Sequence, residues 1–256
     1  MNSSRKQRVA KSAGISPSAR AASQALRRVA SPQKARLLAG YFKTGPGGYA
    51  EGDRFLGVMV PQTRSVAREF RDLPHSETLK LLRSSFHEER LLALLIWVDR
   101  FERGGAEERE RIRGAYLANT KHINNWDLID LTAPRILGPF LRNPRSGMSG
   151  RMRKFIRSNS LWERRIALLS TFHLFNHGSF ALFLEFAERV LKDDEDLIHK
   201  ASGWGLREAG KRDMEVLLGF LKDHGNRMPR TMLRYAIERL PKVERMQWLK
   251  ETRTGS

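Results

Sequence analysis

A tryptophan and an aspartate four residues apart are the pair in this chain best suited to chemistry. They lie in the segment NNWDLID, which contains Trp126 and Asp130. Residues four apart share one face of a helix, and Asn124 or Asn125 is a good N-cap that would place Trp126 in the first turn. Because an acid beside an aromatic ring stands out in so basic a chain, we interpret the other elements as a scaffold that aims this pair at an anionic partner.

The same residues also allow a purely structural interpretation. Asp127 or Asp130 could stabilise the start of the helix. Arg164 and Arg165 could form a solvated face or pair with Glu163. Without further information, both interpretations stay open.

Trp204 is less easily explained by packing alone, because it lies between Gly203 and Gly205. Two glycines within a helix cost stability, so they indicate close approach by another chain or a ligand. We assign the other three tryptophans to packing: Trp97, Trp162 and Trp248.

The usual metal and cofactor motifs are missing. The chain has no cysteine, and His173 and His177 are four apart with no third ligand at an obvious spacing. We therefore expect no metal and no other cofactor. Lys200 could act as the nucleophile of a Schiff-base lyase, which is an alternative to a metal-free hydrolysis.

Composition favours a folded protein with an anionic partner. The 256 residues carry a net charge of +19, with 29% charged and 40% hydrophobic residues. Such an excess of Lys and Arg indicates nucleic acid first, with a merely basic protein or membrane-surface binding as alternatives. The longest apolar run, residues 91–98, is far too short to span a membrane. With no secretory signal and no cysteine, we expect a cytoplasmic protein, associated with the nucleoid when bound to DNA.

The N-terminus predicts a basic tail. No acidic residue precedes Glu51. We expect residues 1–18 to be disordered and able to act as an electrostatic arm on DNA, although their composition also resembles an organellar transit peptide. Residues 19–256 are expected to form a single domain.

Beyond the tail, apolar spacing predicts helices throughout. One or two short helices are expected over residues 18–40 and another over 61–70, with the glycine-rich residues 41–49 as a turn or, less plausibly, a phosphate cradle. Helix pairs follow, whose second members begin near residues 87, 125, 161, 197 and 229. The first members are expected at residues 77–84, 107–119, 151–157, 180–191 and 213–222. The second members are expected at residues 87–101, from Trp126, and at 161–175, 197–209 and 229–240. Intervals of roughly 32 to 38 residues predict an all-α protein, an α-solenoid (superhelix) of HEAT-like helical repeats.

Second helices normally line the concave surface of such a solenoid, and here they carry aromatic and basic residues near their starts. That combination suits a nucleic-acid backbone. The first of them offers Glu88, Glu89 and Arg90. The expected DNA-binding residues on this lining are Arg207, Arg164, Lys200, Arg230 and Arg234.

Six segments in order resemble the AlkD-type family of DNA alkylation repair glycosylases, over roughly residues 35–240. They are YFKTGPGGYAEGDRFLGVMVPQTR, SSFHEERLLALLIWV, NNWDLID, LWERRIALLSTF, DLIHKASGWGLREAGK and MPRTMLRYAIERLP. The resemblance implies a solenoid that binds duplex DNA in its concave face. It also implies hydrolysis of the N-glycosidic bond of cationic purines such as 3-methyladenine and 7-methylguanine.

The family's functional residues are an aspartate, two tryptophans and an arginine. By resemblance these are Asp130, Trp126, Trp204 and Arg165, with no departure at any of the four positions. The resemblance implies a metal-free, monofunctional enzyme that needs no deep base-flipping pocket, and we expect a monomer. Two alternatives remain: a non-catalytic protein that binds damaged or branched DNA, and a HEAT-type scaffold that binds proteins.

Overall fold

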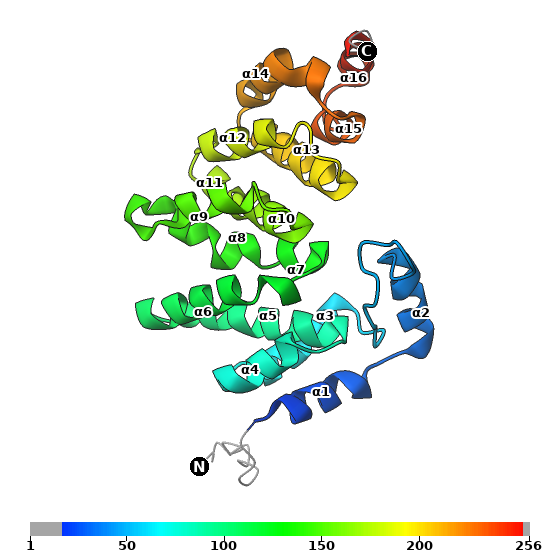
Figure 1. Ribbon diagram of the computed structural model, residues 1–256, viewed down its shortest axis with the longest axis vertical. Helices are drawn as coiled ribbons and strands as arrows, with labels where there is room; N and C mark the ends of the chain where they lie inside the picture. The colour runs from blue at the N-terminus through cyan, green and yellow to red at the C-terminus, as the bar shows by residue number, and fades with distance from the viewer. Residues whose placement is uncertain (1–16, 253–256) are drawn as a thin grey trace, which may run out of the picture.

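A computed structural model describes residues 17–252, and this part of the chain is helical with no strand. Figure 1 shows the helices stacked in one curved series from α1 to α16. The predicted all-α architecture of stacked helix pairs is therefore confirmed. Most of the predicted tail, residues 1–16, lies outside the described residues.

The helix pairs form two rows. In Figure 1 the helices of the inner row from α7 onward lie toward the side on which α2 stands, and their outer-row partners lie toward the opposite side. The outer row consists of α4 (His75–Leu82), α6 (Ala106–Ala118), α9 (Met148–Phe155), α12 (Ala181–Arg189) and α14 (Met214–His224). The inner row consists of α5 (His87–Arg103), α7 (Trp126–Asp130), α10 (Leu161–Ser170), α13 (Asp196–Gly210) and α15 (Arg230–Ala236). The five helices of the inner row begin within one residue of their predicted starts.

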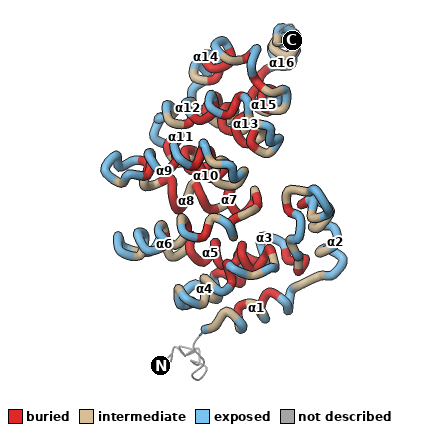
Figure 2. Tube along the Cα trace, viewed as in Figure 1, coloured by how far each residue is buried: buried red, intermediate tan, exposed pale blue. Residues whose placement is uncertain are grey.

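The core runs along the middle of the stack. Figure 2 shows buried stretches passing through α5, α7, α8 (Ala133–Ile136) and α10. The apolar run at residues 91–98 is buried completely, with Trp97 at 0% exposure. Because each large apolar side chain contributes about 2 kcal/mol on burial, this one helix supplies a substantial part of the fold's stability.

One predicted helix is interrupted. Residues 161–175 form α10 and the short α11 (Phe172–Phe175), with Thr171 between them. The hydroxyls of Ser170 and Thr171 donate to the carbonyls of Ile166 and Leu168, at 2.7 and 2.6 Å. Such bonds compete with the helical ladder and bend helices, which explains the break. The prediction also omitted α8 and the last helix, α16 (Lys242–Glu251).

The N-terminal helices form where expected. They are α1 (Ala19–Arg28), α2 (Pro32–Tyr41) and α3 (Val60–Glu69). The segment between α2 and α3, which we call the 42–59 loop, does not behave as the simple turn expected from its glycines. Figure 1 shows it beside α7, and α2 contributes no buried residue of its own. The loop must therefore be held by other contacts.

The first turn of α5 supplies one of these contacts. The buried carboxylate of Glu88 accepts hydrogen bonds from the backbone amides of Leu56, Gly57 and Val58, at 2.9, 2.8 and 3.1 Å. Gly57 has φ +79°, and a Cβ there would run into the carbonyl oxygen of Ser31. Three charge-assisted bonds and a position open to glycine alone thus fix the end of the 42–59 loop.

The next two residues of α5 are buried in the same way. Glu89 accepts from the Ser23 hydroxyl at 2.6 Å and pairs with Arg27 at 3.2 Å, which fastens α1. Arg90 donates two bonds to Asp53, at 2.9 and 2.8 Å. The expectation that the start of this helix contributes to the lining was therefore wrong, because its charged residues hold the N-terminal segment instead.

We predict that Glu88→Ala destabilises the protein by about 3 kcal/mol, because it leaves three amides without their acceptor. Equilibrium unfolding in urea measures this loss. The matched control is Glu107→Ala, which removes an exposed carboxylate whose one ion pair within residues 17–252 is with Arg111 and should change stability by less than about 0.5 kcal/mol. Equal effects of the two substitutions would contradict the role of Glu88.

Candidate active site

The predicted helix at Trp126 is present and short. It is α7, and Asn125 is its N-cap, as the sequence indicated. The cap differs in one respect from the expectation, because the Asn125 side chain makes no capping hydrogen bond. It is buried, and neither its amide nitrogen nor its oxygen has a partner among the described residues.

Asp130 and Arg165 form a bidentate ion pair. Arg165 Nε lies 2.8 Å from Asp130 Oδ1, and Nη2 lies 2.8 Å from Oδ2. The third nitrogen, Nη1, donates to the carbonyl of Leu197 at 2.6 Å. One guanidinium on α10 thus connects α7 with the first residues of α13. The structural alternative that paired Arg165 with Glu163 is therefore wrong.

The environment of Asp130 is unusual for a carboxyl group. Its side chain is 15% exposed and that of Arg165 is 6% exposed. Burial raises the pKa of Asp130 above its usual range, and the charge and hydrogen bonds of Arg165 act in the opposite direction. Each carboxylate oxygen accepts one bond from Arg165 and retains a lone pair for another donor or a cation. The pair can therefore present an oriented, poorly hydrated negative charge.

Trp126 is held by the 42–59 loop. Its Nε1 donates to the hydroxyl of Tyr49 at 3.0 Å. Its ring stacks on Phe42 with centroids 5.2 Å apart, and the edge of Tyr41 approaches at 6.0 Å. Neither Tyr49 nor Phe42 was predicted as a site residue from the sequence. The aromatic residues on both sides of the loop's glycines were the sequence signal that could have pointed to them.

A buried charge network connects the loop to α7. The imidazole of His87 lies between two carboxylates, with Nε2 2.8 Å from Asp127 and Nδ1 3.4 Å from Asp53. Burial opposes a charge on His87, but Asp127 and Asp53 together raise its pKa above the ordinary value. Burial would likewise raise the pKa of Asp53, yet the bond to His87 and the charge of Arg90 lower it overall.

Trp204 lies on α13, the inner helix that follows α10. Its half-buried ring packs edge-on against Phe172, with centroids 4.9 Å apart. Among the described residues, Trp204 makes no hydrogen bond or ring contact with Trp126, Asp130 or Arg165. The structure therefore brings Asp130 and Arg165 together directly and places the two tryptophans on α7 and α13, the inner helices on either side of α10.

The glycines beside Trp204 serve helix packing. A Cβ at Gly203 would collide with the backbone of Met232 on α15, and one at Gly205 would collide with the ring of Phe183. Close approach was expected from another chain or a ligand. It comes instead from this chain's own side chains and backbone.

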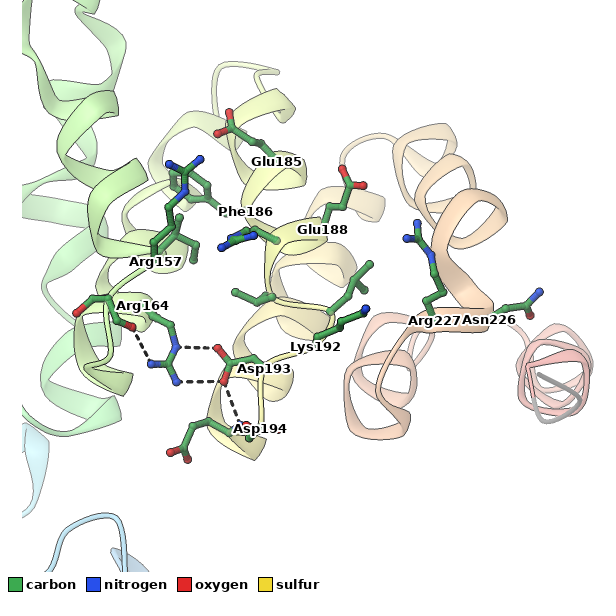
Figure 3. Close-up of a pocket in the computed structure, with 16 residues that line it drawn as sticks. Arg157, Arg164, Glu185, Phe186, Glu188, Lys192, Asp193, Asp194, Asn226 and Arg227 are labelled. Carbon is green, nitrogen blue, oxygen red and sulfur yellow. Dashed lines mark hydrogen bonds and ion pairs between the residues drawn. The ribbon is translucent and has the colours of Figure 1, made fainter. Parts of the chain in front are cut away.

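Arg164 forms an ion pair with Asp193 at the side of a groove. Its Nε lies 2.7 Å from Asp193, and Nη1 donates to the carbonyl of Ser158 at 2.9 Å. The pair lines a groove with a volume of about 1010 Å³. Figure 3 shows Arg157 and Lys192 among acidic side chains in the same groove. The charges of this groove largely offset one another, so Arg164 is a weaker candidate for a phosphate contact than its position in the sequence indicated.

The other predicted DNA-binding residues differ in availability. Arg207 pairs with Glu238 and Glu208, and Lys200 pairs with Asp196 at 2.8 Å. Arg230 and Arg234 lie on α15. Both are exposed, and neither forms an ion pair with any described residue.

No metal or membrane feature emerges from the described part of the chain. Residues 17–252 contain no group of three or more His, Asp or Glu side chains that could hold an ion. The rings of His173 and His177 lie 5.5 Å apart. In the same residues, no helix has both the length and the apolar character needed to cross a membrane.

Fold and site together define an all-α helical-repeat protein with a buried carboxylate–guanidinium pair on its inner row. A family model described as "DNA alkylation repair enzyme" matches residues 22–240, and the chain belongs to this family. Its role is therefore in DNA repair, with DNA as its partner.

A solved structure has the same fold. It is described as a "predicted DNA alkylation repair enzyme" from Enterococcus faecalis, and it superimposes with a TM-score of 0.64. The two sequences are 18% identical, and the match covers 83% of this chain and 97% of the other. No curated protein matches the sequence.

The His87 network predicts a pH-dependent stability. Because the pKa of His87 is raised above 6.5 in the folded state, its contribution is complete below that pH and is lost as pH rises through the folded pKa. We expect the free energy of unfolding to fall over this range in the wild type and to fall less in His87→Gln. Urea unfolding at a series of pH values measures both slopes.

The control is His177→Gln, which changes an exposed histidine with no carboxylate partner among the described residues and should keep the wild-type slope. A wild-type stability that stays level as pH rises would contradict the prediction. So would an unchanged slope in His87→Gln.

Proposed function

We propose that this protein is a DNA glycosylase that hydrolyses the N-glycosidic bond of cationic alkylated purines in duplex DNA. The substrates we infer are of the 3-methyladenine and 7-methylguanine type. The observation that carries the proposal is the bidentate pair between Asp130 and Arg165, which keeps an oriented carboxylate near the ring of Trp126 on the inner row.

The chemistry needs such a carboxylate. An N-alkylated purine is already a cationic leaving group, so its departure requires little general acid. Positive charge then develops on the deoxyribose, which comes to resemble an oxocarbenium ion. A preorganised negative charge in a poorly hydrated site stabilises that state more than it would in water. Asp130 would stabilise the sugar cation and orient the attacking water.

The other three residues have supporting roles in this proposal. Arg165 holds both oxygens of Asp130 and so fixes the direction in which the carboxylate presents its free lone pairs. The rings of Trp126 and Trp204 would flank the sugar, because the face of an indole attracts a cation and excludes water. Their positions on α7 and α13, the inner helices on either side of α10, suit a substrate that spans all three helices.

Duplex DNA would lie along the inner row. The net charge of +19 favours a polyanion, and Arg230 and Arg234 are exposed cations on the last inner helix. Association driven by phosphate neutralisation weakens as salt concentration rises. We therefore infer salt-dependent binding of the monomer to the duplex.

A lyase mechanism through Lys200 is disfavoured. Its ammonium group bonds to Asp196 at 2.8 Å, and this bond raises the pKa of Lys200 above its usual value. A Schiff base requires the neutral amine, which such a pair makes scarcer. The reaction we propose therefore stops at base release.

The proposal is tested by incubating the protein with methylated duplex DNA and measuring the released bases under single-turnover conditions. We expect release of 3-methyladenine or 7-methylguanine by the wild type. Asp130→Asn should lower the rate by about 100-fold or more, because it removes the charge that stabilises the sugar cation. Binding to the same duplex should stay close to wild type.

Glu185→Gln is the matched control. Glu185 also forms a bidentate pair, with Arg153 at 2.8 and 2.7 Å, but on the outer row. The Glu185→Gln variant should release the base at the wild-type rate. Absence of base release by folded wild-type protein would refute the glycosylase. Salt-dependent binding without release would then favour the non-catalytic DNA-binding alternative.

A second substitution examines the aromatic contribution. Trp204→Ala should lower the rate of base release by roughly 10-fold, since it removes one ring face from the developing cation. The same single-turnover assay measures it. Trp248→Ala on α16 is the control and should leave the rate of base release unchanged. Equal losses of rate in the two variants would contradict a specific role for Trp204.

A further inference from the structure

The hydroxyl of Tyr49 is engaged on both sides. It accepts the hydrogen bond from Trp126 Nε1 at 3.0 Å and donates to the backbone carbonyl of Tyr41 at 3.5 Å. Burial raises the pKa of Tyr49 above its ordinary value, so the hydroxyl keeps its proton. Because the proton is directed toward a carbonyl, a lone pair of the oxygen is left for the indole.

The loop that carries Tyr49 is internally braced. The amide of Gly47 donates to the carboxylate of Glu51 at 2.9 Å, and the amide of Gly48 donates to the carbonyl of Gly45 at 3.0 Å. A Cβ at Gly48 would collide with the backbone of Lys43. Consecutive tight turns of this kind leave the position of Tyr49 little freedom.

Both ends of the loop are fastened to the inner row. Near its start, Phe42 lies between the rings of Trp126 and Phe55, with centroids 5.2 and 5.0 Å away. Near its end, Asp53 bonds to Arg90 and His87 on α5. The loop is therefore a fixed support for the indole.

Tyr49 also contacts the next inner helix. Its ring lies edge-on to Trp162 on α10, with centroids 6.2 Å apart. It is close enough to Lys200 on α13 for that charge to influence it. A single side chain thus connects the loop with two successive inner helices, α7 and α10.

We propose that Tyr49 is a positioning residue that fixes the indole plane of Trp126 relative to Asp130. The attraction of a cation to an indole depends on the ring presenting its face. A tryptophan in the first turn of the five-residue helix α7 has few neighbours in its own element to set that plane. The stack on Phe42 and the hydrogen bond to Tyr49 together supply the missing constraint. This inference rests on the proposed glycosylase function.

The test is Tyr49→Phe, which removes the hydroxyl and keeps the ring against Trp162. In protein labelled with ¹⁵N at the indoles, the Trp126 signal, assigned with Trp126→Phe, should shift while that of Trp248 stays in place. Single-turnover base release should fall between about 3-fold and 10-fold, the range expected for one hydrogen bond. The dissociation constant for the methylated duplex should stay within about twofold.

Two further variants sharpen the result. Tyr235→Phe removes a hydroxyl from α15 that makes no bond to Trp126, and it should leave the Trp126 signal unchanged. Gly48→Ala moves the loop itself and should shift the Trp126 signal without removing the hydroxyl. Unfolding midpoints verify that each variant is folded.

An unshifted Trp126 signal in folded Tyr49→Phe overturns the inference, and so does an unchanged rate of base release. A rate that falls in proportion to weakened DNA binding, with no shift of the signal, makes Tyr49 a DNA contact and also overturns it. If the wild type releases no base, the proposed function fails and positioning for catalysis fails with it. The indole signal then still decides separately whether Tyr49 holds Trp126.

Discussion

The buried carboxylate of Asp130 is the constraint on which the inner row depends. Removing an ionised carboxylate from water costs several kcal/mol, and this cost is offset only by well-aligned donors and an opposite charge. Arg165 supplies both through two parallel bonds of 2.8 Å, and its third nitrogen bonds to the carbonyl of Leu197. The bonds of Arg165 therefore fix the relative positions of α7, α10 and α13. They do so at the same place where the inner row carries the buried carboxylate of Asp130.

The same principle attaches the N-terminal segment to the stack. Glu88 satisfies three amides of the 42–59 loop, and His87 lies between Asp127 of α7 and Asp53 of the loop. Both are buried near the start of α5, where apolar contacts alone would leave these polar groups unpaired. The loop and α7 are thus connected by one network, so the geometry around Trp126 depends on residues far away in the sequence.

The sequence predicted the parts of this molecule that repeat. Apolar periodicity located all five inner helices within a residue of their starts, because a helix that buries one face must space its apolar residues regularly. It could not predict the break at Thr171, where side-chain hydroxyls compete for carbonyls within a strongly apolar run. Nor could it predict that Tyr49 contacts Trp126, because those residues are 77 positions apart and a glycine-rich loop has no period.

Residue type alone also could not show that the adjacent Arg164 and Arg165 have different partners. Side chains of consecutive helix residues point about 100° apart, so Arg164 meets Asp193 while Arg165 meets Asp130. Pairing leaves the net charge of +19 unchanged, so the long-range attraction of DNA is unaffected. A short bond to a phosphate, however, needs a donor that is not already engaged. Total charge therefore favours attraction of a duplex as a whole, whereas exposed cations without an ion pair to any described residue, such as Arg230 and Arg234, are the ones left free to donate to a phosphate.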